Sequence, residues 1–159
     1  MLNQKIEENT KNANLSKNMQ KHMLDFVAFL NDNDFFIEPE GENGWRIIDM
    51  DECVGHMNFA ELGLWIDVCD FDGSEAASDF ADDALKEFTW AHVRTCDHFH
   101  SDGKQCGCGS QPGFHKTILG KKYENLCFAA LEFMSPNAKT LERIQELLLL
   151  YKQNKLKGK

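Results

Sequence analysis

The chain has 159 residues, 42% of them hydrophobic and seventeen aromatic, which suits one domain with a packed core and excludes a disordered chain. Its net charge of −9 disfavours nucleic acid and anionic membranes as partners, because both attract positive patches. The N-terminal residues lack an apolar segment of signal-peptide length, and no apolar run approaches the roughly 18 residues of a membrane span. We therefore expect a cytoplasmic protein with reduced cysteines.

The first half of the chain predicts one helix followed by strands. Residues 1–14 are polar and rich in Asn, so we expect a weakly specified arm before a single domain over 15–159. Apolar residues at intervals of three and four predict a helix over about 16–31. Short apolar segments predict four strands, at 35–38, 45–50, 53–59 and 63–71. The second and third strands are expected to pair as a hairpin around Asp51 and Glu52.

The second half predicts helix, hairpin and helix. A second helix is expected over about 76–93, and two strands, "HKTIL" and "YENLCFAALEF", are joined by a turn at 120–122. A last helix is expected over about 138–155, after Pro136. This order predicts an α+β fold, in which a mainly antiparallel sheet packs against three helices and a Cys/His loop follows the second helix.

The Cys/His loop, residues 96–109 ("CDHFHSDGKQCGCG"), is the segment richest in metal ligands. Its candidate ligands are Cys96, His98, His100, Cys106 and Cys108. Structural zinc sites take four Cys or His ligands, and the glycines of the loop allow tight bends around an ion. We expect the three cysteines to bind zinc together with one of the two histidines. Four protein ligands would make the site structural, whereas three plus a water would leave an open, catalytic position; a fifth candidate ligand favours the closed form.

Other interpretations of the same loop stay open. His92 and His115 lie close enough along the chain to serve as reserve ligands. The loop thiols could instead form a redox switch, for which Cys96 with Cys106 would be easier to bridge than the strained pair Cys106 and Cys108. A Cys–His nucleophile pair is a further alternative, and so is a polar loop whose thiols have no role. No catalytic constellation is identified, so the sequence leaves open whether the protein is an enzyme.

The remaining polar and aromatic residues have structural explanations. Eight acids and one base lie between Asp67 and Glu87, which is typical of a solvated acidic face. His56 is expected to be a partly buried, hydrogen-bonded side chain in a strand. Three cysteines fall within strand patterns and are expected to act as small apolar residues: Cys53, Cys69 and Cys127. The tryptophans are expected in the core or at its rim, with a small-molecule cleft as the alternative: Trp45, Trp65 and Trp90.

Residues 88–151 carry a recognisable run, "W-A-H-V…C…C-G-C-G…K-T-I-L-G-K-K-Y-E-N-L-C…F-M-S-P". It resembles small, functionally uncharacterised bacterial proteins in which a Cys-bearing, Gly-rich loop precedes an I-[FL]-G-K-x-[FY]-x-N-[VL]-C hairpin and a terminal helix. The matching hairpin positions are Ile118, Leu119, Gly120, Lys121, Tyr123, Asn125, Leu126 and Cys127. Those proteins have paired C-x-x-C cysteines, whereas this chain has C-x-H and C-x-C spacings. The resemblance implies no activity and supplies no catalytic residue.

Taken together, the sequence predicts a cytoplasmic binding or interaction module with a structural zinc site in the Cys/His loop. The alternative is a domain that binds a small molecule or effector in an aromatic-lined cleft. A third possibility is an enzyme that uses an open metal site or a reactive thiol. Whether the partner is a small molecule or a protein is not determined by the sequence.

Overall fold

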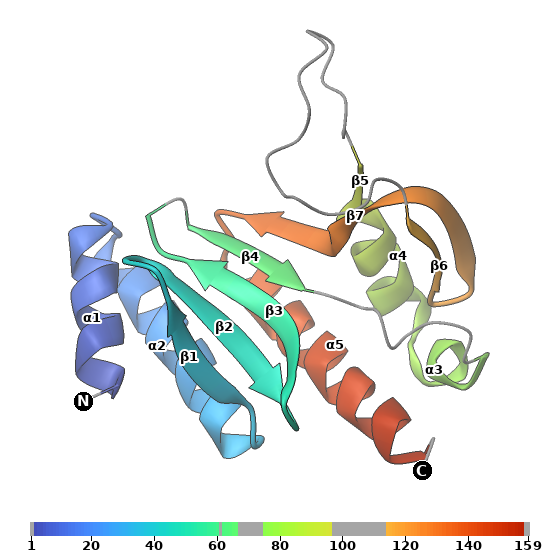
Figure 1. The fold of residues 1–159 in the computed structure, drawn as a ribbon, viewed down its shortest axis with the longest axis horizontal. Helices are drawn as coiled ribbons and strands as arrows, with labels where there is room; N and C mark the ends of the chain where they lie inside the picture. Colours follow the sequence, from blue (N-terminus) through green and yellow to red (C-terminus); the bar gives the residue numbers. More distant parts are fainter. Residues whose placement is uncertain (1, 61, 67–74, 97–113, 158–159) are drawn as a thin grey trace, which may run out of the picture. The chain divides into compact units, whose positions relative to one another are not determined.

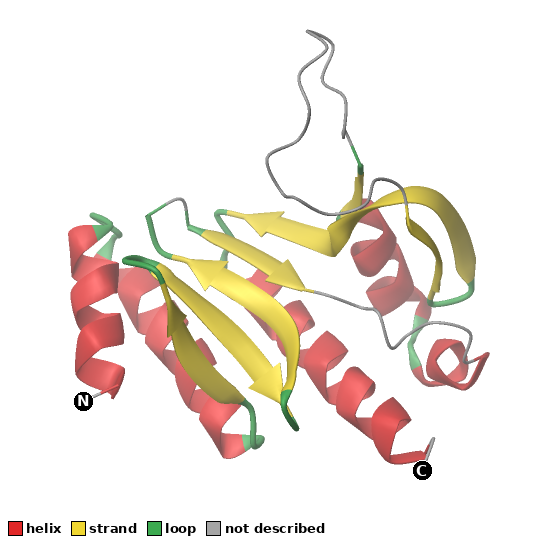
Figure 2. Cartoon of the chain, in the orientation of Figure 1, coloured by secondary structure: helices red, strands yellow, loops and turns green. Residues whose placement is uncertain are grey.

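The computed structural model describes residues 2–60, 62–66, 75–96 and 114–157. These residues form five helices and seven strands (Figure 1), and every strand pairing that has a defined register is antiparallel. The predicted α+β class is therefore confirmed, with more helices than the three expected (Figure 2). Of the four residues predicted to complete the zinc site with Cys96, none lies in this part of the chain.

The chain divides into two compact units, which are described separately. Unit 1 comprises residues 1–66 and 133–146, and unit 2 comprises residues 67–132 and 147–159. The elements of unit 1 are α1 (Leu2–Asn12), α2 (Lys17–Asp32), β1 (Phe36–Glu40), β2 (Gly44–Asp49), β3 (Glu52–Asn58) and β4 (Gly63–Ile66). Its four strands pair antiparallel in chain order, so each connection is a hairpin.

Helix α2 begins and ends close to the predicted positions. The Ser16 side chain caps it by accepting a hydrogen bond from the Met19 backbone N–H at 3.2 Å. One stripe of the helix is buried, as the apolar periodicity predicted: Met23, Phe26, Val27 and Leu30. This hydrophobic stripe is therefore the face by which α2 packs into unit 1.

Helix α1 covers most of the segment expected to be a weakly specified arm. Ile6, Asn9 and Thr10 are all buried, and α1 contacts α2, beside which it lies in Figure 1. The Trp45 indole Nε1 on β2 donates a hydrogen bond to Asn9 Oδ1 at 3.2 Å. Two of the three buried positions are polar, so the helix has no apolar periodicity by which the sequence could have predicted it.

Unit 2 contains the strands that flank the Cys/His loop. Its elements are α3 (Glu75–Phe80), α4 (Asp83–Ala91), β5 (Val93–Thr95) and β6 (Phe114–Ile118), together with most of β7 (Lys121–Met134) and the second half of α5 (Ala138–Lys157). The single helix predicted over 76–93 is two helices. The reason is Asp82, whose Oδ1 accepts a hydrogen bond from the Leu85 backbone N–H at 2.7 Å and so starts α4 anew.

The turn between β6 and β7 lies at Leu119–Gly120, one residue earlier than predicted. Both residues have positive φ, 48° and 86° respectively, which is the geometry of a tight two-residue hairpin turn. A Cβ added at Gly120 would lie 3.1 Å from Ser78 Oγ on α3. Two separate constraints, backbone and steric, therefore favour glycine at this position.

Gly120→Ala should destabilise the protein by about 1–2 kcal/mol, because a side chain is strained at this φ and must also displace the Ser78 hydroxyl. Gly41 is the matched control, since its φ is +70° and nothing lies within 4 Å of the position of its Cβ. Gly41→Ala should show only the cost of the backbone. Urea unfolding of both variants measures the difference, and equal losses would show that the contact with Ser78 has no energetic weight.

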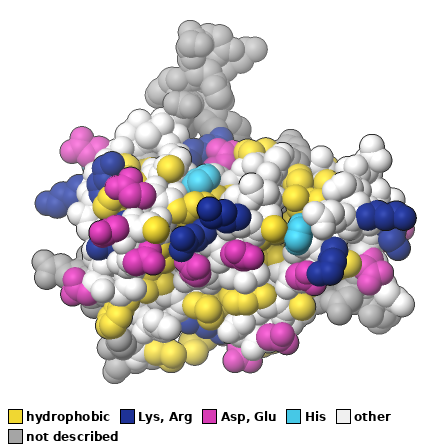
Figure 3. All heavy atoms as spheres, turned by 180° about the vertical axis from the view of Figure 1, so that it is seen from behind, with side chains coloured by type: hydrophobic (Ala, Val, Ile, Leu, Met, Phe, Trp, Pro, Cys, Tyr) yellow, Lys and Arg dark blue, Asp and Glu magenta, His cyan; other side chains and the backbone are white. Residues whose placement is uncertain are grey.

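Charged side chains of both signs lie among hydrophobic ones on the face drawn in Figure 3. The prediction that the chain binds no nucleic acid is compatible with this mixture and stays a prediction. In the part of the chain that the structure describes, no helix combines the length and the apolar character needed to cross a membrane.

Candidate functional site

Of the five predicted zinc ligands, Cys96 is the one that lies within the described residues. His98, His100, Cys106 and Cys108 fall in the range 97–113, outside them. The site is therefore built here from the two strands that lead into and out of the Cys/His loop.

Cys96 follows β5 directly and is held by two hydrogen bonds to one residue of β7. Its backbone N–H donates to the Asn125 carbonyl oxygen at 2.7 Å, and its carbonyl oxygen accepts from Asn125 Nδ2 at 3.1 Å. Asn125 has a φ of 61°, a backbone conformation that Asn tolerates better than most residues. The Cys96 thiol is free and half-buried. The backbone of the residue that starts the loop is thus held by β7, while its side chain is a free thiol.

The two strands that flank the Cys/His loop pair with the same residue of β7. Thr95 at the end of β5 and Phe114 at the start of β6 both pair with Leu126, which is fully buried. One residue can pair with two strands only on its two opposite edges, so β7 runs between β5 and β6 at this point. With neighbouring strands spaced about 4.8 Å apart, the stems of the loop are about 10 Å from each other. A segment whose ends lie this close can return on itself, as a small metal cage requires.

The reserve ligands His92 and His115 stand on the same two stems. His92 follows α4 and its Nδ1 donates to the Phe88 carbonyl oxygen at 2.8 Å, which leaves Nε2 as the acceptor nitrogen in the neutral ring. His115 is exposed on β6, where the register with β7 shifts. In the described ranges no three Cys, His, Asp or Glu side chains come together as metal ligands. A metal site at this place needs ligands from the loop itself.

In comparisons with known proteins, no family model, no curated protein and no solved structure matches this chain. The resemblance noted in the sequence therefore rests on its motif alone and stays an expectation. The structure nevertheless gives local reasons for three motif positions. Leu119 and Gly120 form the hairpin turn, and Asn125 holds Cys96.

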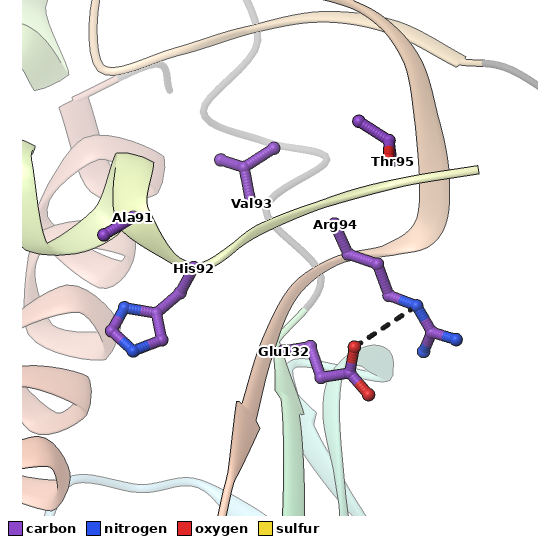
Figure 4. Close-up of a pocket in the computed structure, with 6 residues that line it drawn as sticks. All are labelled: Ala91, His92, Val93, Arg94, Thr95 and Glu132. Atoms are coloured by element: carbon purple, nitrogen blue, oxygen red, sulfur yellow. Dashed lines mark ion pairs between the residues drawn. The ribbon is translucent and has the colours of Figure 1, made fainter. Parts of the chain in front are cut away.

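An open pocket of about 420 Å³ lies against β5, lined by Ala91, His92, Val93, Arg94, Thr95 and Glu132 (Figure 4). His92 and Arg94 point to one side of β5, whereas Val93 and Thr95 point to the other, as strand alternation requires. Arg94 Nε lies 3.3 Å from Glu132 Oε2, with both side chains partly exposed. Water weakens this ion pair because both side chains are partly exposed. The charged groups that line the pocket are therefore already paired with each other.

Neither Trp45 nor Trp90 is among the residues that line this pocket. Trp45 is 1% exposed in the core of unit 1. Trp90 is half-buried on α4, and its Nε1 donates to the Ile118 carbonyl oxygen at 2.8 Å, while Lys121 Nζ lies 5.4 Å from its ring centroid. Both indoles therefore have structural roles of the kind the sequence predicted. The side chain of Trp65 is outside the described set, so the aromatic-lined cleft stays a prediction.

A group of chemistry-bearing residues that the sequence did not predict lies in unit 1. Cys53, His56 and Glu40 form a continuous chain of contacts on the sheet. His56 is partly buried and hydrogen-bonded, as expected, but its partners are a thiol and a carboxylate. The spacing of Cys53 and His56 would place them on opposite faces of a regular strand, so periodicity gave no sign of this group.

Proposed function

We propose that the protein is a binding or interaction module whose Cys/His loop is held by a structural zinc ion. The ligands would be the thiolates of Cys96, Cys106 and Cys108 and one imidazole, from His98 or His100. The observation that carries the proposal is that Thr95 and Phe114, on the strands before and after the ligand-rich segment, both pair with Leu126.

The environment of Cys96 supports this role. Zinc binds the deprotonated thiolate, and Cys96 is a free thiol whose backbone is fixed by Asn125. A ligand already held in place loses less conformational freedom on binding than one on a flexible chain. The other ligands then order the loop around the ion, and the metal binding energy becomes part of the folding energy.

We further propose a cytoplasmic location, because reduced thiols are the form that zinc requires and that this compartment maintains. Cys96 and Cys127, two of the cysteines within the described residues, are free thiols. Because the chain has a net charge of −9, we expect the partner of the zinc-bound loop to be a protein or a small molecule rather than nucleic acid.

Small-molecule binding is the second candidate, and the pocket on β5 favours it. A ligand there would have to carry both a negative and a positive group to replace the Arg94–Glu132 pair. The pocket adjoins Thr95 and therefore the stem of the loop, so zinc binding and ligand binding at this place are compatible.

The zinc content of the purified full chain tests the proposal. We expect close to one zinc per chain by elemental analysis, and a large loss in the double variant Cys106→Ser, Cys108→Ser. Cys127→Ser is the matched control, since Cys127 is a half-buried free thiol on β7, and it should keep the metal. A chain without zinc after purification and after incubation with added zinc would reject the metal site.

A further inference from the structure

Cys53, His56 and Glu40 are arranged as a nucleophile, a base and an acid that orients the base. His56 Nε2 lies 3.5 Å from Cys53 Sγ, and His56 Nδ1 lies 2.7 Å from Glu40 Oε2. The imidazole thus contacts a thiol with one nitrogen and a carboxylate with the other. This is the order of contacts that activates a thiol for nucleophilic attack.

A β-bulge places the thiol and the imidazole on the same face of β3. Cys53 pairs with Ile48 and Gly55 pairs with Ile47, so Val54 is one residue more than β2 provides. Val54 and Gly55 are both buried, whereas Cys53 and His56 on either side of them are only half-buried. Without the extra residue, positions three apart would face opposite sides of the sheet.

The carboxylate of Glu40 fixes the protonation pattern of the imidazole. A carboxylate can only accept, so Nδ1 of His56 carries the proton of that hydrogen bond. In the neutral ring Nε2 is then the acceptor, and it faces the Cys53 thiol. The thiol proton can pass to Nε2, and the imidazolium that forms is stabilised by the negative charge of Glu40.

The group is open to small molecules. The side chains of His56 and Glu40 are 31% and 51% exposed, and Cys53 is half-buried. The Sγ atom also lies 3.5 Å from the Gly55 carbonyl oxygen, which keeps the thiol on the side of the sheet where His56 lies. A reagent with little bulk can therefore reach the sulfur beside its base.

We propose that Cys53 is a reactive thiol that exchanges with small disulfides, with His56 as its base and Glu40 as the residue that positions His56. The Cys53 proton moves to His56 Nε2, and the thiolate attacks one sulfur of the disulfide R–S–S–R. A new bond forms between Cys53 Sγ and that sulfur while the original S–S bond breaks. The leaving R–S⁻ takes the proton from His56 and departs as R–SH, so Cys53 is oxidised and half of the reagent is reduced.

The charges around Cys53 favour disulfides that are cationic. Acids predominate on the strands and the turn beside it: Glu38, Glu40, Asp51 and Glu52. Arg46 is the positively charged residue on these strands, and its Nη2 is paired with Glu38 Oε2 at 2.8 Å. A negative surface concentrates cations and repels anions, so a diamine disulfide should react faster than a dicarboxylate disulfide of similar size.

The test follows the reaction of the full chain with cystamine by mass spectrometry of quenched, digested samples. Cys53 should form the mixed disulfide about tenfold faster than Cys127, a half-buried thiol that serves as the internal reference. The variant His56→Ala should slow Cys53 to about the rate of Cys127. Glu40→Gln should slow it by several-fold, and Glu40→Asp should restore most of the rate, because the charge returns. A dicarboxylate disulfide should react more slowly than cystamine at Cys53.

Equal rates at Cys53 and Cys127, or an unchanged rate in His56→Ala, would overturn the proposal. Should His56→Ala unfold the chain, Glu40→Gln decides the matter alone, since this side chain is half exposed at the end of β1. An unaltered Cys53 rate in Glu40→Gln would then reject the role of the acid. None of these outcomes depends on zinc in the Cys/His loop.

Discussion

Replacing the paired cysteines of the loop, Cys106→Ser together with Cys108→Ser, should lower the Tm by roughly 10 °C. A ligand present at about a thousand times its Kd stabilises the folded state by about 4 kcal/mol. For a chain of this size each kcal/mol corresponds to roughly 2–4 °C in Tm. The variant loses that contribution because two of the four zinc ligands are gone. Thermal unfolding followed by circular dichroism measures the shift.

Chelation of zinc from the natural chain should reproduce the same loss. A strong chelator should lower the Tm of the natural chain to that of the double variant and leave the variant unchanged, since both treatments remove the same ion. Cys127→Ser makes the same chemical change on β7 and should respond to the chelator as the natural chain does. A chelator that shifts all three proteins equally, or none of them, would contradict a structural zinc site.

Trp45→Ala should lower the free energy of unfolding by about 3–5 kcal/mol, as expected for truncating a large buried side chain. Trp45 is 1% exposed and is among the largest fully buried residues. It also donates a hydrogen bond to the buried side chain of Asn9, which would lose this donor in the variant. Helix α1 would lose one of its polar links at the same time, while Asn9 Nδ2 would keep its bond to the Glu42 carbonyl oxygen at 3.4 Å. Urea unfolding measures the change.

Two controls show whether the loss is specific to the core. Phe36→Ala removes an aromatic ring that is 66% exposed on β1, so it should change stability by less than about 0.5 kcal/mol. Asn9→Ala removes only the polar partner on α1 and should cost about 1 kcal/mol. If Trp45→Ala costs no more than Phe36→Ala, then α1 and β2 do not pack as described.

Elements with strong local signals could be predicted from the sequence. The apolar stripe and the Ser16 cap determine α2, and the last helix begins at Ala138, as expected, where the Asn137 Oδ1 accepts the Thr140 backbone N–H at 2.9 Å. Two of the hairpins, β2–β3 and β6–β7, were expected, although their turns lie one residue earlier. At Met50–Asp51 and Leu119–Gly120 the backbone has positive φ, and three of these four residues are not glycine. Residue type alone therefore gave little indication of where the chain turns.

Elements that depend on long-range contacts could not be predicted. Helix α1 is fixed by burial of Asn9 and Thr10 and by the bond from Trp45, 36 positions away from Asn9. Strand β5 is three residues long and continues the chain from α4, and it is defined by its pairing with β7. Neither element has a periodic apolar pattern of its own, because what stabilises it comes from elsewhere in the chain.

The two candidate sites also differ in whether the sequence could predict them. The Cys/His loop could be found from the sequence, because its ligands are close together in the chain and their residue types suit zinc. The Cys53 group could not, because Glu40 is 16 positions from His56 and the shared face depends on an extra residue in β3. A bulge has no sequence signature comparable to a metal-ligand spacing.

X-ray absorption at the zinc edge of the metal-loaded chain tests the zinc proposal most directly. We predict a first shell of three sulfurs near 2.3 Å and one nitrogen near 2.0 Å, the distances typical of a closed tetrahedral site. In Cys106→Ser, Cys108→Ser the sulfur number should fall or the metal should be lost. A shell made only of nitrogen and oxygen would mean that the cysteines of the loop do not share an ion, and the zinc-bound loop would have to be abandoned.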